Sequence, residues 1–180
     1  VLWNTKKDSF AIEEGSFQGG VGFRYKPLKM HNFFLGVERL IKIGDQAQDN
    51  WLLRNAYSWG VGRELKRDAH SWNYTSFYVD AGYFVKDPTW AYFSEFRQGV
   101  SLNYRNQLLV IPHVTVSGRW QDPDPFEASY SEGGVGVLFG HTINSSSPQG
   151  KGLDMEVLLQ YKFPFDGSAS GLIISGVIRK

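Results

Sequence analysis

Few residues of this chain have the type and spacing that acid–base or nucleophilic catalysis requires. His113 precedes Ser117 by four residues within an alternating segment. Four residues of an extended strand span about 13 Å, which is too far for a hydrogen bond between these side chains. A partner for His113 on a neighbouring strand stays open. The remaining histidines stand singly and form no His-x-His or His-Glu-x-x-His motif: His31, His70 and His141. We therefore predict no catalytic residues and no enzyme.

Metal and cofactor chemistry finds little support either. The chain has no cysteine, which excludes disulfides, thiolate metal sites and thiol nucleophiles. The segment 120–126 holds Asp122 and Asp124, each followed by proline. Asp-Pro pairs favour turns, and calcium needs more oxygen ligands than this segment offers. We expect no metal and no cofactor.

The charge balance limits the partners. Lys and Arg total 19 and Asp and Glu total 18, so the formal net charge is only +1. Binding to nucleic acid needs a basic surplus on one face, and we expect none. No run approaches the roughly 20 apolar residues of a membrane helix. A membrane role would therefore have to be carried by strands, because only helices and closed barrels satisfy every backbone group in lipid.

Apolar and polar residues alternate with a period of two along most of the chain. Residues 152–164 are the clearest case, since Leu153, Met155, Val157 and Leu159 fall on one face and acidic or amide residues on the other. We expect these four side chains to point outward. Comparable segments cover residues 16–27, 32–43, 50–62, 71–86, 89–104, 107–121, 130–143 and 171–180.

The length of these segments indicates the fold class. Most have about 10–16 residues, whereas strands of ordinary globular proteins have about 5–6 and membrane strands about 9–11. We predict an all-β fold, an antiparallel up-and-down outer-membrane β-barrel, or the C-terminal part of a larger one. Residues 1–180 would form a single domain of a longer protein. Nine strands do not close a bacterial barrel, which uses an even number. A tenth strand within residues 1–14, or further strands upstream, would meet that requirement.

Aromatic residues gather near the predicted strand ends. In a membrane barrel they would form two interfacial girdles, and in a soluble β-sandwich they would form the core. The candidates are Trp51, Trp59, Trp72, Tyr83, Phe84, Trp90, Tyr104, Trp120, Tyr161 and Phe163.

Ionisable residues of both signs occupy the opposite, polar face. In a barrel they would point into the lumen, where they would pair across strands or line a path for a sugar or an ion. The lumen-facing candidates are Arg24, Glu38, Arg54, Asp80, Glu95, Arg97, His113, Arg119, Asp154, Glu156 and Lys162, with Lys26 and Lys42 of the same type. Arg39 is the exception, because alternation places it on the apolar face beside Val37 and Ile41. A bulge or a position at the rim must accommodate it.

Several short motifs resemble those of a known family. They are Leu35-Gly-Val-Glu-Arg-Leu-Ile-Lys-Ile-Gly-Asp45, Asn50-Trp-Leu-Leu-Arg54, Tyr92-Phe-Ser-Glu-Phe-Arg-Gln-Gly99, Pro112-His-Val114, Glu132-Gly-Gly-Val-Gly136 and Leu158-Leu-Gln-Tyr161. Over residues 35–161 the chain resembles the C-terminal domain of NfrA, in the family of outer-membrane phage adsorption proteins. This chain departs from the usual barrel pattern at its end. Barrel chains usually end on an aromatic residue, whereas this sequence ends on Lys180. Either the chain continues past Lys180 or its assembly signal is degenerate.

The resemblance implies a function in the outer membrane of a Gram-negative bacterium. The family pairs an upstream helical-repeat domain with a C-terminal barrel, takes part in surface exopolysaccharide export and serves as a bacteriophage receptor. The expected partners are outer-membrane lipid, a secreted polysaccharide, a phage protein and the helical-repeat domain of the same chain. A second possibility is a lumen-filled barrel that only anchors that domain.

Phage contacts, if this domain makes them, should lie in the longer polar connections. These connections are residues 63–70, 121–129 and 145–151. Loops can vary without disturbing the strand pairing, and aromatic residues dominate protein interfaces. The candidate contact residues are Arg63, Asp122, Asp124 and Phe126.

Overall fold

The computed structural model describes residues 18–28, 31–43, 48–64, 66, 69–104, 108–122, 129–143, 153–165 and 170–179. Regular structure in these ranges is entirely β, which confirms the all-β prediction. The limits of the nine predicted strands agree with the structure to within two residues. The strands are β1 (Gln18–Tyr25), β2 (Asn32–Lys42), β3 (Asn50–Val61), β4 (Ser71–Phe84), β5 (Thr89–Tyr104), β6 (Leu108–Asp122), β7 (Tyr130–Ile143), β8 (Leu153–Pro164) and β9 (Gly171–Arg179). None of the described segments is a helix long and apolar enough to cross a membrane.

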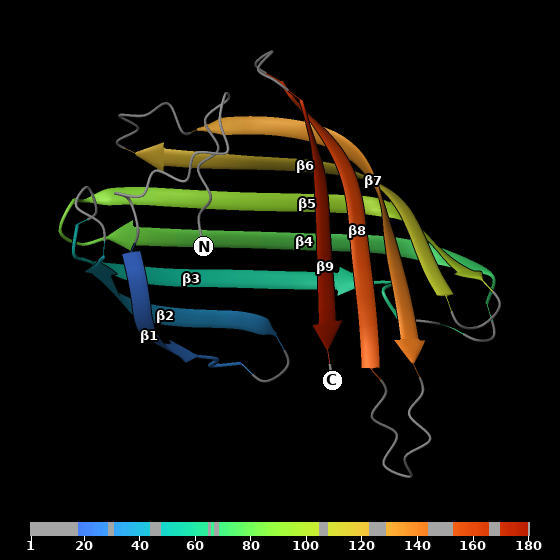
Figure 1. The fold of residues 1–180 in the computed structure, drawn as a ribbon, viewed down its shortest axis with the longest axis horizontal. Coiled ribbons are helices and arrows are strands. Elements are labelled where there is room, and N and C mark those ends of the chain that lie inside the picture. Colours follow the sequence, from blue (N-terminus) through green and yellow to red (C-terminus); the bar gives the residue numbers. More distant parts are fainter. Residues whose placement is uncertain are drawn as a thin grey trace, which may run out of the picture.

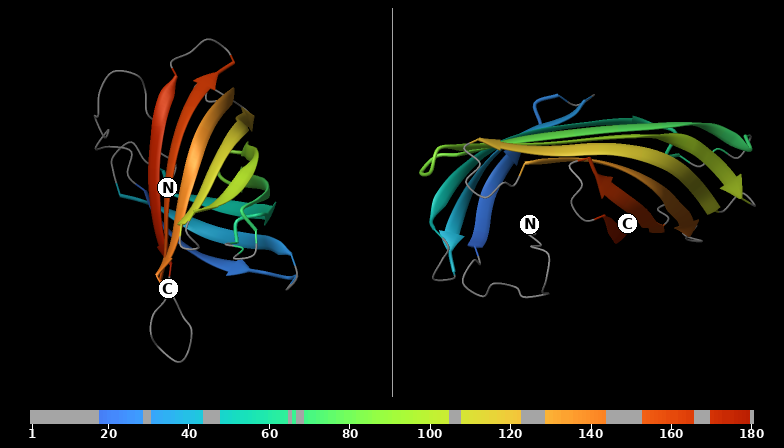
Figure 2. Two further views of the ribbon diagram at one scale, coloured as in Figure 1. Left: turned by 90° about the vertical axis from the view of Figure 1, so that its right-hand side faces the viewer. Right: turned by 90° about the horizontal axis from the view of Figure 1, so that it is seen from above.

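All nine strands form one up-and-down antiparallel sheet. Each strand pairs with its neighbour in sequence, in the order β1 to β9 (Figure 1). The sheet curls into a trough that stays open, with β1 and β9 as its two edges among the described strands (Figure 2). The tenth strand considered for residues 1–14 lies outside the described residues.

The two faces of the sheet differ sharply in chemistry. Side chains of β8 meet side chains of β4 and β5 on one face only, in ion pairs and in an apolar cluster. This face is therefore the concave one. On the convex face, large apolar side chains remain exposed on every strand except β4, Val116 at 53% and Val135 at 53% among them. Alternation along each strand thus separates a polar inside from an apolar outside.

Glycines on the concave side of β7 allow tight packing where the strand bends (Figure 1). Gly136 lies between His113 of β6 and Gln160 of β8 in the register. A Cβ atom on Gly136 would lie 2.9 Å from the Leu159 carbonyl oxygen and 3.0 Å from His113 Nε2. Only glycine leaves the imidazole room to lie across β7, so larger residues at this position would push the strands apart.

Short and long connections are not separated between the two ends of the sheet. Strict up-and-down order places the β3–β4, β5–β6 and β7–β8 connections at one end of the sheet and the β4–β5 and β6–β7 connections at the other. The four-residue turn 85–88 therefore lies at the end of the sheet where β6 ends and β7 begins. Of the predicted contact loops, residues 123–128 and 145–151 lie outside the described residues. The strands that precede the three loops do not end together, because β6 ends opposite to β3 and β7.

Candidate functional site: the polar concave face

The concave face carries a compact ion network on β5 to β8, with Lys162 at its centre. The Lys162 ammonium lies 2.6 Å from Glu132 and 3.4 Å from Glu95, and it donates a 2.8 Å hydrogen bond to Ser117. Arg97 pairs with Glu95 at 2.6 Å. Lys162 is buried, and its partners expose less than a fifth of their side chains. Two cations and two carboxylates thus neutralise one another away from bulk water, as buried charges must.

A second ion network lies on β1 to β4. The Arg54 guanidinium forms a salt bridge with Asp80, and its Nε lies 2.9 and 3.0 Å from the two carboxylate oxygens. Tyr78 donates a 2.9 Å hydrogen bond to the same carboxylate. Glu38 lies 4.0 Å from Arg54 and 3.1 Å from Arg24, so the pairing runs across four strands. This arrangement gives the face a polar surface with little net charge.

An apolar cluster fills the concave face near the start of β4. It comprises Tyr74, Leu109, Ile111, Leu138 and Leu158, with Trp72 packed against them. Ile111 is fully buried and Tyr74 is 2% exposed. Side chains of β4, β6, β7 and β8 therefore already occupy this part of the trough.

His113 does not form a catalytic pair with Ser117. Its Nδ1 lies 3.0 Å from the Ile111 carbonyl oxygen, which only accepts, so Nδ1 carries the proton. Its ring packs edge-on against Tyr74, with centroids 6.0 Å apart. Ser117 instead donates to Glu132 at 2.8 Å and accepts from Lys162. The described residues also contain no group of three or more His, Asp or Glu placed to hold a metal ion.

Four buried polar atoms near His113 find no hydrogen-bond partner within the described part of the chain. They are Arg97 Nε, His113 Nε2, Thr115 Oγ1 and Gln160 Nε2. The register aligns Arg97 with Thr115, and His113 with Gly136 and Gln160. The centre of the concave face is thus polar but incompletely satisfied.

The structure places the predicted polar residues on this one face. The strand alternation and contacts bring together Arg24, Glu38, Arg54, Asp80, Glu95, Arg97, His113, Arg119, Glu156 and Lys162. The side chain of Asp154 lies outside the described residues. The predicted candidates did not include Glu132, Ser117 or Gln160, although alternation places Ser117 and Gln160 on the polar face. Alternation could have found Glu132, which is two residues from Gly134 on the same face of β7.

Of the predicted contact residues, Arg63 and Asp122 are described and Asp124 and Phe126 are not. Asp122 is exposed at the end of β6. Arg63 follows β3 at the opposite end and forms an ion pair with Glu156 of β8. It therefore lies on the concave side, and its role as a contact residue stays a prediction.

Aromatic residues of the convex face gather at the end where β4 joins β5. Tyr83 and Trp90 lie 4.7 Å apart between ring centroids, Trp90 and Tyr92 5.9 Å, and Tyr92 and Trp120 5.3 Å. Two predicted girdle residues belong to the other face. Trp72 donates to the Gly62 carbonyl and joins the concave cluster, and Phe84 alternates with outward-facing Tyr83.

Arg39 is accommodated at the rim and not by a bulge. Its strand pairs in regular register, with Arg39 opposite Trp51. The guanidinium lies 5.4 Å from the Trp51 ring and 2.9 Å from Asp49, in the connection after β2. Asp49 also accepts a 2.7 Å hydrogen bond from the backbone N–H of Lys42. That bond, followed by the attraction of Arg39, lowers the pKa of the Asp49 carboxyl.

A group of three polar side chains interrupts the apolar convex face on β4 and β5. Thr75 donates to Gln98 at 2.8 Å, and Gln98 donates to Asn73 at 2.7 Å. These three side chains satisfy one another, so the interruption is small in energetic terms.

The predicted convex residues of β8 lie as expected. Met155, Val157 and Leu159 are about two-fifths exposed on that face, while Leu158 and Gln160 on the opposite face are buried. The side chain of Leu153 lies outside the described residues.

Comparison with known proteins identifies the family. Searches of curated proteins and of solved structures found no match. The sequence model of the family described as "Bacteriophage N adsorption protein A C-term" matches residues 11–174, nearly the whole chain. The match confirms the resemblance noted from the motifs, and the chain belongs to this family of phage adsorption protein A C-terminal domains.

Proposed function

We propose that this domain forms part of the wall of an outer-membrane β-barrel and so anchors a phage adsorption protein at the surface of a Gram-negative bacterium. The observation that carries this proposal is the division of the sheet into an apolar convex face and a polar, ion-paired concave face. A soluble protein rarely exposes an apolar surface that covers a whole sheet. Lipid is the environment that suits such a face.

The strand lengths support the same conclusion. β5 has 16 residues, which span about 50 Å at ~3.3 Å per residue. At the tilt of about 45° typical of membrane strands, such a strand rises ~35 Å, more than the ~30 Å of a hydrocarbon core. The aromatic cluster of Tyr83, Trp90, Tyr92 and Trp120 would then lie at one membrane interface.

The proposed barrel needs strands that these nine do not supply. β1 and β9 form the two edges of the described sheet, and both run in the same direction because their numbers differ by eight. Antiparallel closure between them therefore requires an odd number of further strands. We assign these strands, and an upstream helical-repeat domain, to the rest of the protein.

The proposed role is structural and recognitive, not enzymatic. The central charged groups of the concave face are engaged in ion pairs, and His113 and Ser117 have separate partners. Phage recognition would use the connections at the rim that faces the medium. β7 ends at one end of the sheet and β6 at the other, so the β6–β7 and β7–β8 connections cannot both face outward.

Loop replacement in the full-length protein tests this function. Each of the two loops is replaced by a Gly/Ser connector of equal length. Assembly is checked by outer-membrane fractionation and by heat-modifiable migration on a gel, and phage adsorption is then measured. We expect both variants to assemble and one to lose adsorption. Normal adsorption by both variants would show that another part of the protein recognises the phage and that this domain serves as an anchor. Failure of the unaltered protein to fractionate with the outer membrane would overturn the proposal itself.

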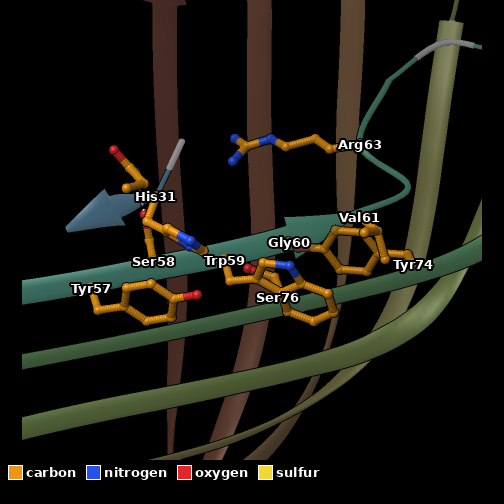
Figure 3. A pocket seen from close by; sticks show the side chains of 10 residues that line it. His31, Tyr57, Ser58, Trp59, Gly60, Val61, Arg63, Tyr74 and Ser76 are labelled. Atoms are coloured by element: carbon orange, nitrogen blue, oxygen red, sulfur yellow. Dashed lines mark hydrogen bonds between the residues drawn. The ribbon is translucent and has the colours of Figure 1, made fainter. Parts of the chain in front are cut away.

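Passage of a hydrophilic polymer, such as an exopolysaccharide, is a second candidate. It is favoured by a hollow of about 370 Å³ beside β3, lined by Asn32, Ser58, Tyr74 and Ser76 among others (Figure 3). Hydroxyl and amide groups bordered by neutralised charges suit an uncharged polar solute. Comparing extracellular polysaccharide between a deletion strain and a strain carrying the full-length gene tests this role. Equal amounts from both strains would exclude it.

A further inference from the structure

The chain turns toward the concave face directly after β3. Gly62 has a φ of +86°, and a Cβ atom there would lie 2.1 Å from the Asn73 carbonyl oxygen. The Gly62 carbonyl accepts hydrogen bonds from Trp72 Nε1, at 2.8 Å, and from the Ser101 hydroxyl. Both donors belong to the concave face, so this peptide is fixed against the inside of β4 and β5. Position 62 requires glycine, and it sets the direction in which Arg63 leaves the strand.

Arg63 then reaches across the trough to β8. Its Nε donates to Glu156 Oε1 at 2.8 Å, and its Nη2 donates to Oε2, which makes the pair bidentate. The two residues are 93 positions apart. Of the ion pairs between described residues, this one joins the strands that lie farthest apart in the sheet. It therefore links the two sides of the trough directly.

The pair lies beside the polar hollow. Arg63 lines the hollow together with Ser58, Tyr74 and Ser76, and Figure 3 shows the His31 and Arg63 side chains projecting on the same side of β3. The Arg63 side chain is 41% exposed and that of Glu156 15%. A pair with one partner in contact with solvent contributes little net stability, because water competes for the charge. It can therefore break and re-form while the strands on either side stay folded.

We propose that Arg63 and Glu156 form a latch that holds β8 over the end of β3 and restricts access to the hollow. Breaking the pair lets the two sides of the trough separate and admits solutes to Ser58 and Ser76. This inference rests on the proposed function, because it takes the concave face as the barrel lumen. It adds a means of regulating entry to that lumen.

Cysteine labelling in the full-length protein tests the latch. This chain has no native cysteine, so Ser76→Cys introduces one thiol at the hollow. The rate of reaction with a bulky, membrane-impermeant maleimide is measured in outer-membrane vesicles. Arg63→Gln and Glu156→Gln, each added to Ser76→Cys, should raise the rate severalfold. The exchanged pair Arg63→Glu/Glu156→Arg should return it toward the starting value. Arg24→Gln breaks an ion pair with Glu38 and should leave the rate unchanged.

The outcomes separate the latch from the proposed function. Equal rates in all backgrounds overturn the latch, and so does a rise that the exchanged pair fails to reverse, since the effect then does not act through the pair. Val116→Cys reports separately on the convex face. If it reacts as fast as Ser76→Cys, the lipid-facing assignment fails, whereas the dependence of Ser76→Cys on Arg63 and Glu156 still decides the latch. Heat-modifiable migration verifies that each variant assembles.

Discussion

Lys162 shows how one buried cation can organise a polar face. Only 8% of its side chain is exposed, and three oxygen-bearing side chains from β5, β6 and β7 surround its ammonium. Without it, Glu132 would keep only the Ser117 hydroxyl among these contacts, and Glu95 would depend on Arg97. The network therefore ties four strands together through a single residue.

Substitution of Lys162 should destabilise the folded protein, and a second substitution should restore much of the lost stability. We expect Lys162→Met to lower the free energy of unfolding by about 3–5 kcal/mol, because it leaves buried carboxylates without their cation. Lys162→Met/Glu132→Leu should recover much of that loss, since the uncompensated charge is removed. Denaturant unfolding of the full-length protein in detergent micelles measures both. A single-variant loss of under ~1 kcal/mol, typical of exposed ion pairs, would contradict the burial of this network.

Asp49 offers a prediction about pH at the rim. Its pKa is lowered in the folded protein, so its contribution to stability is present above the unfolded value near 3.8 and is lost as the pH falls through the lower folded value. Asp49→Asn should therefore reduce the midpoint of thermal unfolding at pH 7, and the difference from the unaltered protein should shrink below pH 4. A difference that is the same at pH 7 and pH 3 would show that the carboxylate charge is not responsible.

At the scale of the strands, local alternation was enough to find all nine elements and the face to which most of their residues belong. The pattern is local because neighbouring side chains of a strand point to opposite faces. Counting back from Asp80 along β4 also assigns Trp72 to the concave face, where the structure has it. The partner of each residue across the sheet could not be predicted, because register depends on the connections. Arg63–Glu156 is the plainest example, since it depends on the curl of the whole sheet.

The close packing at β7 makes a matched pair of glycine substitutions informative. A methyl group on Gly136 would lie 2.9 Å from the Leu159 carbonyl oxygen and 3.0 Å from His113 Nε2, which is closer than van der Waals contact. At Gly171 a methyl group would have no atom within 4 Å. Gly136→Ala should destabilise the protein by about 1–3 kcal/mol, the usual cost of overpacking. Gly171→Ala should be close to neutral. Equal unfolding midpoints for the two variants would show that a methyl group at position 136 fits beside His113 without strain.

At the scale of the whole molecule, the proposed function depends on which solvent surrounds each face of the sheet. The nine strands bury little apolar surface on the convex side, where valines, leucines and aromatic residues remain exposed on every strand except β4. The concave side holds the ion networks, the apolar cluster and the hollow. Soluble proteins mostly expose polar side chains and bury apolar ones, so in water this distribution would be inverted. In a bilayer the apolar convex face would meet lipid and the polar concave face would meet water.

Site-directed spin labelling tests this assignment most directly. Single cysteines at Val114 and Val116 on the convex face, and at Ser58 and Ser76 in the hollow, carry a nitroxide in the full-length protein reconstituted into bilayers. We expect the labels at 114 and 116 to collide often with dissolved oxygen and rarely with a water-soluble nickel complex, and the labels at 58 and 76 to show the reverse. Labels at 114 and 116 as accessible to nickel as those at 58 and 76 would contradict a lipid-facing convex surface.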